Sequence, residues 1–259
     1  MHRLLAETCE LAADRPALSR EASAHLKVVR PKDGERVELF DGRGAMRTFA
    51  WSRAEGALAA VAGEGVRRVP RPATLVLFAC VTKGARWDWT VEKATELGAT
   101  KIVPVVSERT IVRVAPGERA AKRERWMRIA EEAARQSDAA WLPEIAEPVP
   151  FADSLALVER TDCYVGALTD PPPEPILAAL AKRRGLFNHG DRIEGENPLA
   201  LFVGPEGDFA PGELAALLKI ATPASFGPTI LRAETAAIFA LSVLAASLQA
   251  ENAVRKLGA

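Results

Sequence analysis

The fold is decided by residues 199–213, which read LALFVGPEGDFAPGE. The first five residues are apolar, which predicts a strand buried on both faces, and the Gly-Pro-Glu-Gly turn after them ends it. Pro211 and Glu213 favour the first turn of a helix. In α/β sheets, ligands bind beyond the carboxyl ends of the strands, and glycine lets a ligand approach the backbone closely. The segment is therefore a candidate binding loop, although a plain strand-to-helix turn has the same pattern.

Strand and helix patterns alternate on both sides of this segment. The sequence predicts strands at residues 74–81, 101–106, 163–168 and 199–203, and helices at residues 87–97, 118–136, 213–220 and 233–251. Pro104 lies inside the second strand, which favours an edge position or a bulge because proline lacks a backbone N–H. Residues 183–197 are polar without periodicity and are expected to form a mobile loop. The alternation predicts an α/β domain with a mainly parallel sheet at residues 74–259.

Residues 1–70 have the pattern of a separate, small β-rich domain. Short alternating runs, each typical of a strand, occupy residues 25–30, 36–40 and 46–51, with turn-forming residues at 31–34 and 41–44. Several short strands joined by turns predict a small β-barrel. Residues 67–72 contain two prolines and are interpreted as a linker between the two domains.

The composition is that of a globular protein. The 259 residues are 48% hydrophobic and 26% charged, which allows a sizeable core. Three cysteines and three histidines are scattered, which fits neither a disulfide framework nor a zinc site. No apolar run approaches the roughly 20 residues of a membrane helix, and no signal-peptide apolar region follows the first residues. We therefore expect a cytoplasmic protein with no metal and no membrane partner.

The net charge of zero conceals an uneven distribution. Residues 1–135 carry 25 Lys and Arg against 18 Asp and Glu, a net of +7, whereas residues 136–259 carry 9 against 16, a net of −7. A basic first half is consistent with RNA binding, and a chance drift of charge along the chain is the alternative.

A second candidate site segment spans residues 226–236, which read FGPTILRAETA. A Gly-Pro turn and a short apolar stretch precede Arg232 and Glu234 at the start of a helix that is nearly all apolar as far as residue 246. Helix capping with a surface ion pair would explain the two charges without a function. A helix that is apolar on most faces is buried, either in the core or at a subunit interface.

A third segment, residues 83–89, reads KGARWDW and combines two cations with two tryptophans. Cations hold phosphates and an exposed indole can stack on a base, whereas tryptophans in the core would have no such role. Further arginines on the predicted helix at residues 118–136 are expected to form a solvated, ion-paired face. These are Arg123, Arg125, Arg128 and Arg135.

Five motifs, each weak alone, occur together in an order and spacing that is specific. They are KG at 83–84 with EKATELG at 92–98, SER at 107–109, RQS at 135–137, GPEG at 204–207, and GP at 227–228 with ILRAETA at 230–236. Together they resemble the RsmE family, whose members methylate N3 of a uridine in 16S ribosomal RNA. The resemblance covers nearly the whole chain, since residues 25–30 and 41–42 fit the family's RNA-binding barrel, which is similar to a PUA domain.

The resemblance implies a fold, a cofactor and partners. Residues 74–259 would form a SPOUT methyltransferase domain with a deep trefoil knot, preceded by a PUA-like barrel at residues 1–70. The enzyme would be a homodimer with the last helix at its interface, and its substrate would be 16S rRNA or the 30S subunit. S-adenosylmethionine would be held by three loops. The cofactor-binding residues expected from the resemblance are Leu168, Leu201, Val203, Gly204, Pro205, Glu206, Gly207, Phe226, Gly227, Ile230, Leu231, Thr235 and Ala236.

Arg232 and Glu234 are the expected catalytic residues. Arg232 is permanently charged and could stabilise the negative charge that develops on uracil when N3 loses its proton. Glu234 could orient Arg232 or act as the base. The RNA would be bound by a further set of cationic side chains. This set consists of Arg3, Arg30, Arg43, Arg47, Lys83 and Arg86.

The sequence departs from the family pattern at three positions. Asp208 stands where a second glycine is usual, Ala210 where a capping serine is usual, and Thr229 where an arginine is usual. Two alternative functions remain open: a SPOUT methyltransferase acting on another RNA, such as a tRNA ribose 2′-hydroxyl, and a ribosome-assembly factor that binds RNA without catalysis.

Overall fold

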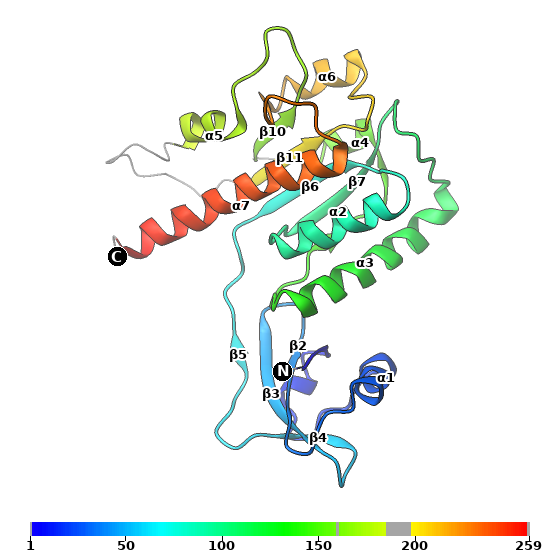
Figure 1. Cartoon of the computed structure of the whole chain (residues 1–259), viewed down its shortest axis with the longest axis vertical. Helices are drawn as coiled ribbons and strands as arrows, with labels where there is room; N and C mark the ends of the chain where they lie inside the picture. The colour runs from blue at the N-terminus through cyan, green and yellow to red at the C-terminus, as the bar shows by residue number, and fades with distance from the viewer. Residues whose placement is uncertain (1, 159–160, 185–197, 258–259) are drawn as a thin grey trace. The chain divides into compact units, whose positions relative to one another are not determined.

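The structure is a computed structural model that describes residues 2–158, 161–184 and 198–257 (Figure 1). Internal contacts divide the chain into two compact units. The smaller unit comprises Met1–Pro72 and Glu131–Leu142, and the larger unit comprises Ala73–Ala130 and Pro143–Ala259. Of the loop predicted at residues 183–197, only the first two residues are described, and they end a helix.

The larger unit is built around a sheet in which all pairings are parallel. The strand order is β12-β10-β11-β6-β7-β8, and β9 also pairs with β7. The strands are β6 (Leu75–Cys80), β7 (Lys101–Val106), β8 (Glu144–Ile145), β9 (Val149–Pro150), β10 (Asp162–Gly166), β11 (Leu199–Val203) and β12 (Thr222–Ala224). The helices are α2 (Ala85–Glu96), α3 (Arg119–Gln136), α4 (Phe151–Leu155), α5 (Ile176–Arg184), α6 (Pro211–Leu217) and α7 (Ala233–Leu257), with a 3-10 turn at Pro116–Glu118. The end of α3, residues 131–136, belongs to the smaller unit. The predicted α/β class with a mainly parallel sheet is confirmed.

The central strands of this sheet are buried on both faces. Every residue of β6 and β11 is buried, and alternate side chains enter two separate hydrophobic clusters. Leu77 and Leu201 join the cluster that contains residues of α2 and α7. Phe78 and Phe202 stack with ring centroids 4.4 Å apart in the cluster that contains residues of α4 and α6. Burial of both faces explains why these strands are continuous apolar runs in the sequence.

Pro104 was predicted to mark an edge strand or a bulge, and the edge alternative is wrong. Strand β7 pairs with β6 on one side and with two short strands on the other. Strand β8 pairs at Lys101 and Ile102, and β9 pairs at Val105 and Val106, so the second neighbour is interrupted beside Pro104. The missing N–H of proline is thus accommodated by splitting the neighbouring strand.

Helix α7 has the composition of a buried helix and is long. The window Ala233–Glu251 has a mean hydropathy of 1.5 and the length to cross a membrane, which corrects the expectation that no segment approaches that length. Half of this window is buried inside the protein. Ala237, Leu241 and Leu244 pack into the cluster against the central strands, so a core position accounts for the apolar composition.

The smaller unit contains a five-stranded sheet of order β1-β2-β3-β4, in which β5 pairs with β3. Its elements are β1 (His2–Leu5), a 3-10 turn (Glu10–Ala12), α1 (Arg20–Val29), β2 (Arg36–Phe40), β3 (Ala45–Ser52), β4 (Ala57–Ala60) and β5 (Arg67–Arg68). The predicted hairpin between β2 and β3 is confirmed. Asp41 Oδ1 accepts hydrogen bonds from the backbone N–H groups of Arg43 and Ala45, and Gly42 adopts a φ of 67°, which glycine tolerates.

The strand predicted at residues 25–30 is wrong, because this segment belongs to α1. The hydroxyl of Ser19 accepts a hydrogen bond from the N–H of Ala22, which caps the helix start. Ala22 and Leu26 are four residues apart and both buried, as expected of one face of a helix. The helix ends at Arg30, which has a left-handed φ of 52°.

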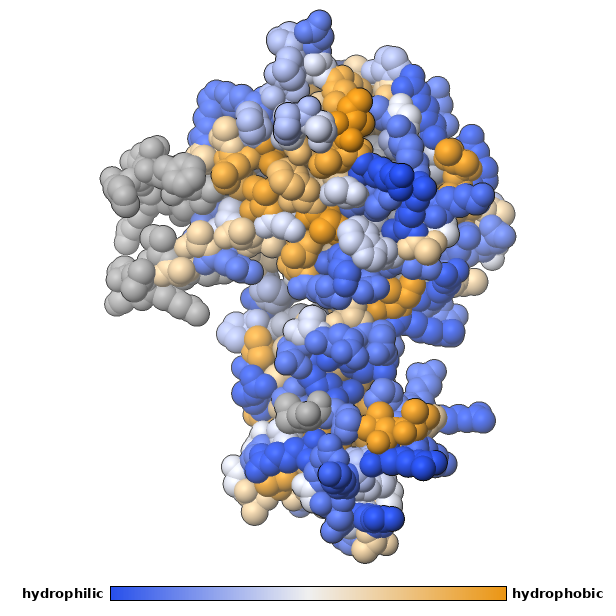
Figure 2. All heavy atoms as spheres, in the orientation of Figure 1, coloured by the Kyte–Doolittle hydropathy of each residue, from blue (hydrophilic) through white to orange (hydrophobic). Residues whose placement is uncertain are grey.

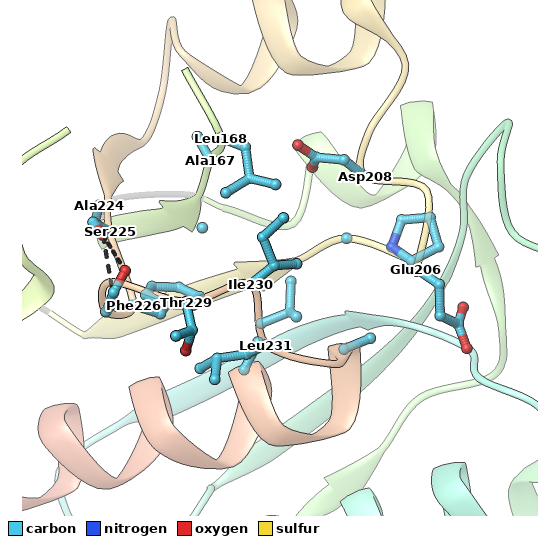
Figure 3. A pocket seen from close by; sticks show the side chains of 17 residues that line it. Ala167, Leu168, Glu206, Asp208, Ala224, Ser225, Phe226, Thr229, Ile230 and Leu231 are labelled. Carbon is cyan, nitrogen blue, oxygen red and sulfur yellow. Dashed lines mark hydrogen bonds between the residues drawn. The ribbon is translucent and has the colours of Figure 1, made fainter. Parts of the chain in front are cut away.

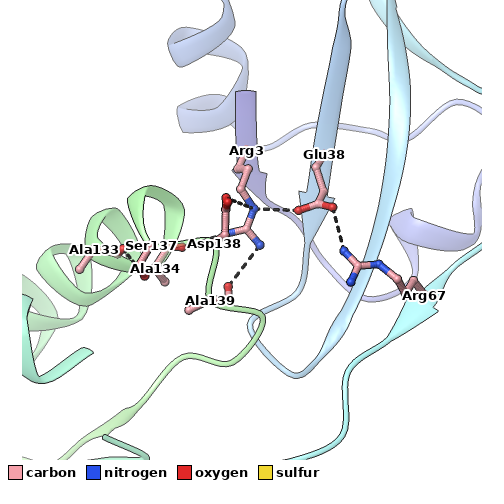
Figure 4. A network of polar contacts seen from close by, with 8 residues as sticks. All are labelled: Arg3, Glu38, Arg67, Ala133, Ala134, Ser137, Asp138 and Ala139. Atoms are coloured by element: carbon pink, nitrogen blue, oxygen red, sulfur yellow. Dashed lines mark hydrogen bonds and ion pairs between the residues drawn. The ribbon is translucent and has the colours of Figure 1, made fainter. Parts of the chain in front are cut away.

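Arg3 is buried in the smaller unit (Figure 4). Its Nε donates to Glu38 Oε1 at 2.8 Å, and its Nη1 donates to the backbone oxygen of Ala134 at 2.8 Å. Arg67 contacts the other oxygen of Glu38 at 3.3 Å. The guanidinium of Arg3 therefore links β1 and β2 to residues 131–142 of the same unit.

We expect Arg3→Met to destabilise the smaller unit, because Glu38 would remain buried with only the exposed Arg67 as a partner. Loss of one partner of a buried pair costs roughly 3 kcal/mol or more. Urea unfolding followed by circular dichroism measures the change. The control is Arg30→Met, since Arg30 is exposed; equal stability of the two variants would contradict a structural role for Arg3.

Candidate functional site

A cleft lies at the carboxyl ends of β10 and β11 in the larger unit (Figure 3). Three segments that are distant in the sequence form it: residues 166–168 after β10, residues 203–208 after β11, and residues 224–236, which join β12 to α7. The cleft has a volume of about 680 Å³, counting the space open to solvent at its mouth.

Most of the predicted cofactor-binding residues line this cleft. They are Leu168, Val203, Gly204, Pro205, Glu206, Phe226, Gly227, Ile230, Leu231 and Ala236. Three others do not line it: Leu201 is fully buried within β11, and Gly207 and Thr235 lie beside lining residues. Seven further lining residues were not predicted from the sequence: Gly166, Ala167, Asp208, Ala224, Ser225, Thr229 and Ala233. All seven adjoin predicted residues or the end of a strand, which was the signal available for them.

Large apolar side chains are exposed inside the cleft. Leu168 is 66% exposed and Ile230 is 82% exposed, and both side chains extend into the space between the loops (Figure 3). Phe226 and Leu231 add partly buried apolar surface. Exposed apolar side chains in a concave site indicate a ligand surface, because their exposure to water is otherwise unfavourable.

Gly166 is required by its contact with Phe226. A Cβ atom at position 166 would lie 2.4 Å from Cε2 of the Phe226 ring, closer than atoms can approach. The glycine therefore allows the ring to lie directly against the end of β10. Gly227, next to the ring, has a φ of 130°, a conformation that also favours glycine.

Two departures from the family pattern are accommodated locally. Asp208 has a φ of 59°, which explains why glycine is usual there, and aspartate is one of the residues that tolerates this conformation. Its Oδ1 accepts a hydrogen bond of 2.7 Å from the N–H of Phe209. Ala210 offers no side-chain cap to α6, but the carboxylate of Glu213 accepts a hydrogen bond from the Ala210 N–H at 3.0 Å.

The SER motif at residues 107–109, to which no role was assigned from sequence, supports the loop after β11. Arg109 Nη1 donates to the backbone oxygen of Gly207 at 2.8 Å. The N–H of Glu108 donates to Glu213 Oε1 at 2.9 Å, so Glu213 connects this motif to the start of α6. These two contacts hold the middle of the loop and the first turn of the helix that follows it.

The motif itself is fixed by a small buried polar cluster. The hydroxyls of Ser107 and Thr110 are 2.9 Å apart, and the Cys80 thiol donates to Ser107 Oγ at 3.4 Å. Burial raises the pKa of the Cys80 thiol to about 11, despite these hydrogen bonds. Cys80 is therefore a neutral structural thiol at the end of β6.

The two predicted catalytic residues are placed differently. Arg232 is exposed, its carbonyl accepts the first hydrogen bond of α7 from Ala236, and its guanidinium has no partner among the residues described. The side chain of Glu234 is only 11% exposed. Its Oε1 lies 3.7 Å from Nε of Arg86, whereas its Oε2 is buried and has no hydrogen-bond partner in the described chain. The structure thus pairs Glu234 with Arg86 and not with Arg232.

Two of the predicted RNA-binding arginines form hydrogen bonds inside the smaller unit. Arg3 holds Glu38 as described above. Arg47, whose side chain is 10% exposed, donates to the backbone oxygens of Leu11, Ala13 and Glu64. Neither guanidinium is free to contact a phosphate, so both arginines have structural roles in the smaller unit.

The other four predicted RNA-binding residues, Arg30, Arg43, Lys83 and Arg86, are exposed. Arg86 differs from the rest because it contacts Glu206 at 3.3 Å as well as Glu234. The two tryptophans near Lys83 also differ from each other. Trp87 is 2% exposed and packs in the core, whereas Trp89 is 40% exposed.

The arginines of α3 form the ion-paired face that the sequence predicts. Arg125 pairs with Asp88 of α2, Arg128 pairs with Glu124, and Arg135 pairs with Glu132. Arg123 instead donates to the backbone oxygen of Ile145 at 2.7 Å.

Comparison with known proteins places the chain among RNA methyltransferases. The family model for an RNA methyltransferase domain matches residues 69–245. The ribosomal RNA small subunit methyltransferase E of Synechocystis is 31% identical over 230 residues, which cover 86% of this chain and 70% of that protein. The protein of the same name from Mycobacterium tuberculosis is 33% identical over 237 residues, covering 86% and 81%.

Solved structures agree over nearly the full length. The ribosomal RNA small subunit methyltransferase E of Neisseria gonorrhoeae, solved with S-adenosylmethionine bound, is 25% identical with a TM-score of 0.77, covering 94% of this chain and 96% of that one. A Legionella pneumophila protein solved with the same cofactor is 27% identical with a TM-score of 0.74, covering 94% and 96%. Family model, curated relatives and fold agree with the motifs that form the cleft, and the chain therefore belongs to the RsmE family of RNA methyltransferases.

Proposed function

We propose that the protein transfers a methyl group from S-adenosylmethionine to N3 of one uridine in the 16S rRNA of the small ribosomal subunit. One observation carries this proposal: the motif segments at residues 204–207 and 227–236, by which the family is recognised, meet in one cleft. The relatives named above supply the substrate class, and the cofactor-bound neighbours supply the cofactor class.

The cleft residues suit S-adenosylmethionine. Leu168, Ile230 and Leu231 offer apolar surface for the adenine ring, and the small residues Gly204 and Ala236 leave room beside the backbone. Among the described residues that line the cleft, only two are charged, and both Glu206 and Asp208 are acidic. Acidic lining favours a ligand with a net positive charge. When bound, the cofactor supplies a methyl group activated by its attachment to a sulfonium.

The residues at the start of α7 would act on the uracil. N3 of uridine carries a proton and becomes nucleophilic only as that proton leaves. The exposed guanidinium of Arg232 can stabilise the negative charge that develops on a uracil carbonyl oxygen. The unpartnered Oε2 of Glu234 can accept the N3 proton, because a buried carboxylate oxygen without a donor favours a ligand that provides one.

Exposed cations of each unit would bind the RNA. N3 lies on the pairing edge of the base, so the target uridine must be unpaired or extruded from a helix. Arg30, Arg43 and Lys83 are exposed cations that can contact phosphates. We assign RNA binding to a PUA-like barrel domain at residues 1–70 and catalysis to a SPOUT domain with a trefoil knot at residues 74–259. The likeness to two methyltransferase structures over more than nine tenths of the chain supports both assignments.

A homodimer and a cytoplasmic location are part of the same proposal. Hydrophobic side chains gather on the face of the larger unit that carries α7 (Figure 2). Phe239 on α7 is 43% exposed and Leu177 on α5 is 52% exposed, so these two helices offer apolar surface to a second copy. A ribosomal substrate requires a cytoplasmic enzyme.

The test of the function is methylation in vitro. The purified protein and labelled S-adenosylmethionine are incubated with 30S subunits that lack the modification, and the digested nucleosides are identified by mass spectrometry. We expect 3-methyluridine at a single site in 16S rRNA. A different methylated nucleoside would assign another RNA target, and RNA binding without methylation would support an assembly factor.

We expect Arg232→Ala to lower kcat by roughly 100-fold or more, the cost of removing one preorganised group that stabilises developing charge. RNA affinity should stay within a few-fold, because Arg232 is assigned to the reacting base and not to a phosphate. Single-turnover methylation and filter binding measure the two effects. The control is Arg113→Ala, an exposed arginine of the same unit; wild-type activity of Arg232→Ala would exclude its assigned role.

We expect Gly166→Ala to weaken binding of S-adenosylmethionine about tenfold or more. The added methyl group would displace the Phe226 ring from its place in the cleft, because the two atoms cannot lie 2.4 Å apart. Calorimetric titration measures the affinity. Gly212→Ala is the matched control, since a Cβ there meets no atom within 4 Å. Equal affinities of the two variants would show that the ring position does not matter for the cofactor.

A further inference from the structure

Arg86 lies between two acidic side chains from different segments of the site. Its Nη1 is 3.3 Å from Glu206 Oε1, and its Nε is 3.7 Å from Glu234 Oε1. Glu206 lines the cleft on the loop after β11, and Glu234 lies between the lining residues Ala233 and Ala236 of α7. We propose that Arg86 is a positioning residue that holds both carboxylates, and with them the two segments, in place for methyl transfer. This proposal rests on the proposed function.

The chemistry of arginine suits this arrangement. A guanidinium carries donors on three nitrogens in a fixed plane, so one side chain can serve two carboxylates at once. The side chain of Arg86 is 46% exposed, that of Glu206 is 34% exposed and that of Glu234 is 11% exposed. The contact with Glu234 is therefore the better shielded from water and salt, and the contact with Glu206 lies on the open side.

The contact with Arg86 determines which oxygen of Glu234 stays free. Because Oε1 lies beside Arg86, the oxygen left without a partner among the described residues is Oε2. A buried carboxylate oxygen without a donor is unfavourable, so a ligand that brings an N–H group is stabilised there. Arg86 thus orients the carboxylate that we assign to the N3 proton without touching the substrate itself.

The same geometry argues against a phosphate contact for Arg86. Two carboxylates around one guanidinium give the cluster a net charge of −1, which repels a phosphate. Lys83, three residues earlier, is also exposed, and its ammonium has no ion-pair partner within the described part of the chain. Of the two cations in this segment, Lys83 is the one available to RNA.

The experiment compares Arg86→Gln, Arg86→Lys and Lys83→Gln in the full-length protein. It measures kcat and KM on 30S subunits, RNA affinity as a function of salt concentration, and the affinity for S-adenosylmethionine. Arg128→Gln is the control for loss of an arginine ion pair, because Arg128 pairs only on the exposed surface of α3.

We expect Arg86→Gln to lower kcat roughly 10- to 100-fold, as misplacement of a reacting group does. Its RNA affinity and salt slope should equal those of the wild type. Lys83→Gln should instead weaken RNA binding. The logarithm of the binding constant should then depend less steeply on the logarithm of the salt concentration, by about the amount that one phosphate contact contributes. Arg86→Lys should recover activity only in part, because an ammonium is a point charge that cannot hold both carboxylates in the same geometry.

Two outcomes would overturn the proposal. A reduced salt slope for Arg86→Gln with an unchanged kcat would make Arg86 a phosphate contact, and wild-type behaviour in every measurement would leave it no role. If the wild type itself did not methylate 30S subunits, the proposed function would fail separately. The affinity for S-adenosylmethionine would then decide the role of Arg86. If the affinity losses of Arg86→Gln and Glu206→Gln do not add up in the double variant, the two side chains act together and the proposal is supported. Additive losses would refute it.

Discussion

The site depends on the parallel register of β10, β11 and β6. Tyr164 of β10 pairs with Leu201 of β11, and Leu201 pairs with Leu77 of β6, so the three strands end at the same edge of the sheet. Parallel strands require long connections, which is why the segments that meet there are far apart in the sequence. Because β11 is buried on both faces, its side chains are fixed by the core, whereas the loops beyond it are free to carry chemistry.

Elements with a strong local pattern could be predicted from the sequence. Two strands have the bounds that the sequence predicts. Residues 199–203 form a continuous apolar run, and residues 36–40 are followed by an Asp-Gly turn, so each pattern leaves few alternatives to a strand. Residues 25–30 alternate over too short a length to decide between strand and helix. This segment is helical because Ser19 caps the start of α1 and because the buried residues of α1 have helical spacing.

Contacts between distant residues could not be predicted in this way. The hydrogen bond from Arg3 to Ala134 spans 131 positions. It lies within the smaller unit, to which residues 131–142 belong although α3 begins in the larger one. The contact between Arg86 and Glu206 spans 120 positions. Residue type alone marked both arginines as RNA ligands, because a cation in a sequence shows its charge but not the carboxylate that neutralises it.

With its departures from the family pattern, the protein has acidic side chains lining the cleft and arginines only outside it. With Thr229 in place of an arginine, the lining residues described carry only the acidic charges of Glu206 and Asp208. Arg86 offsets one of these charges from outside the cleft, and Arg232 remains exposed at the start of α7. A cationic cofactor is thus favoured inside the cleft, whereas a polyanionic RNA is favoured only outside it. The uracil would be the single part of the RNA that enters, since it carries no charge until its N3 proton leaves.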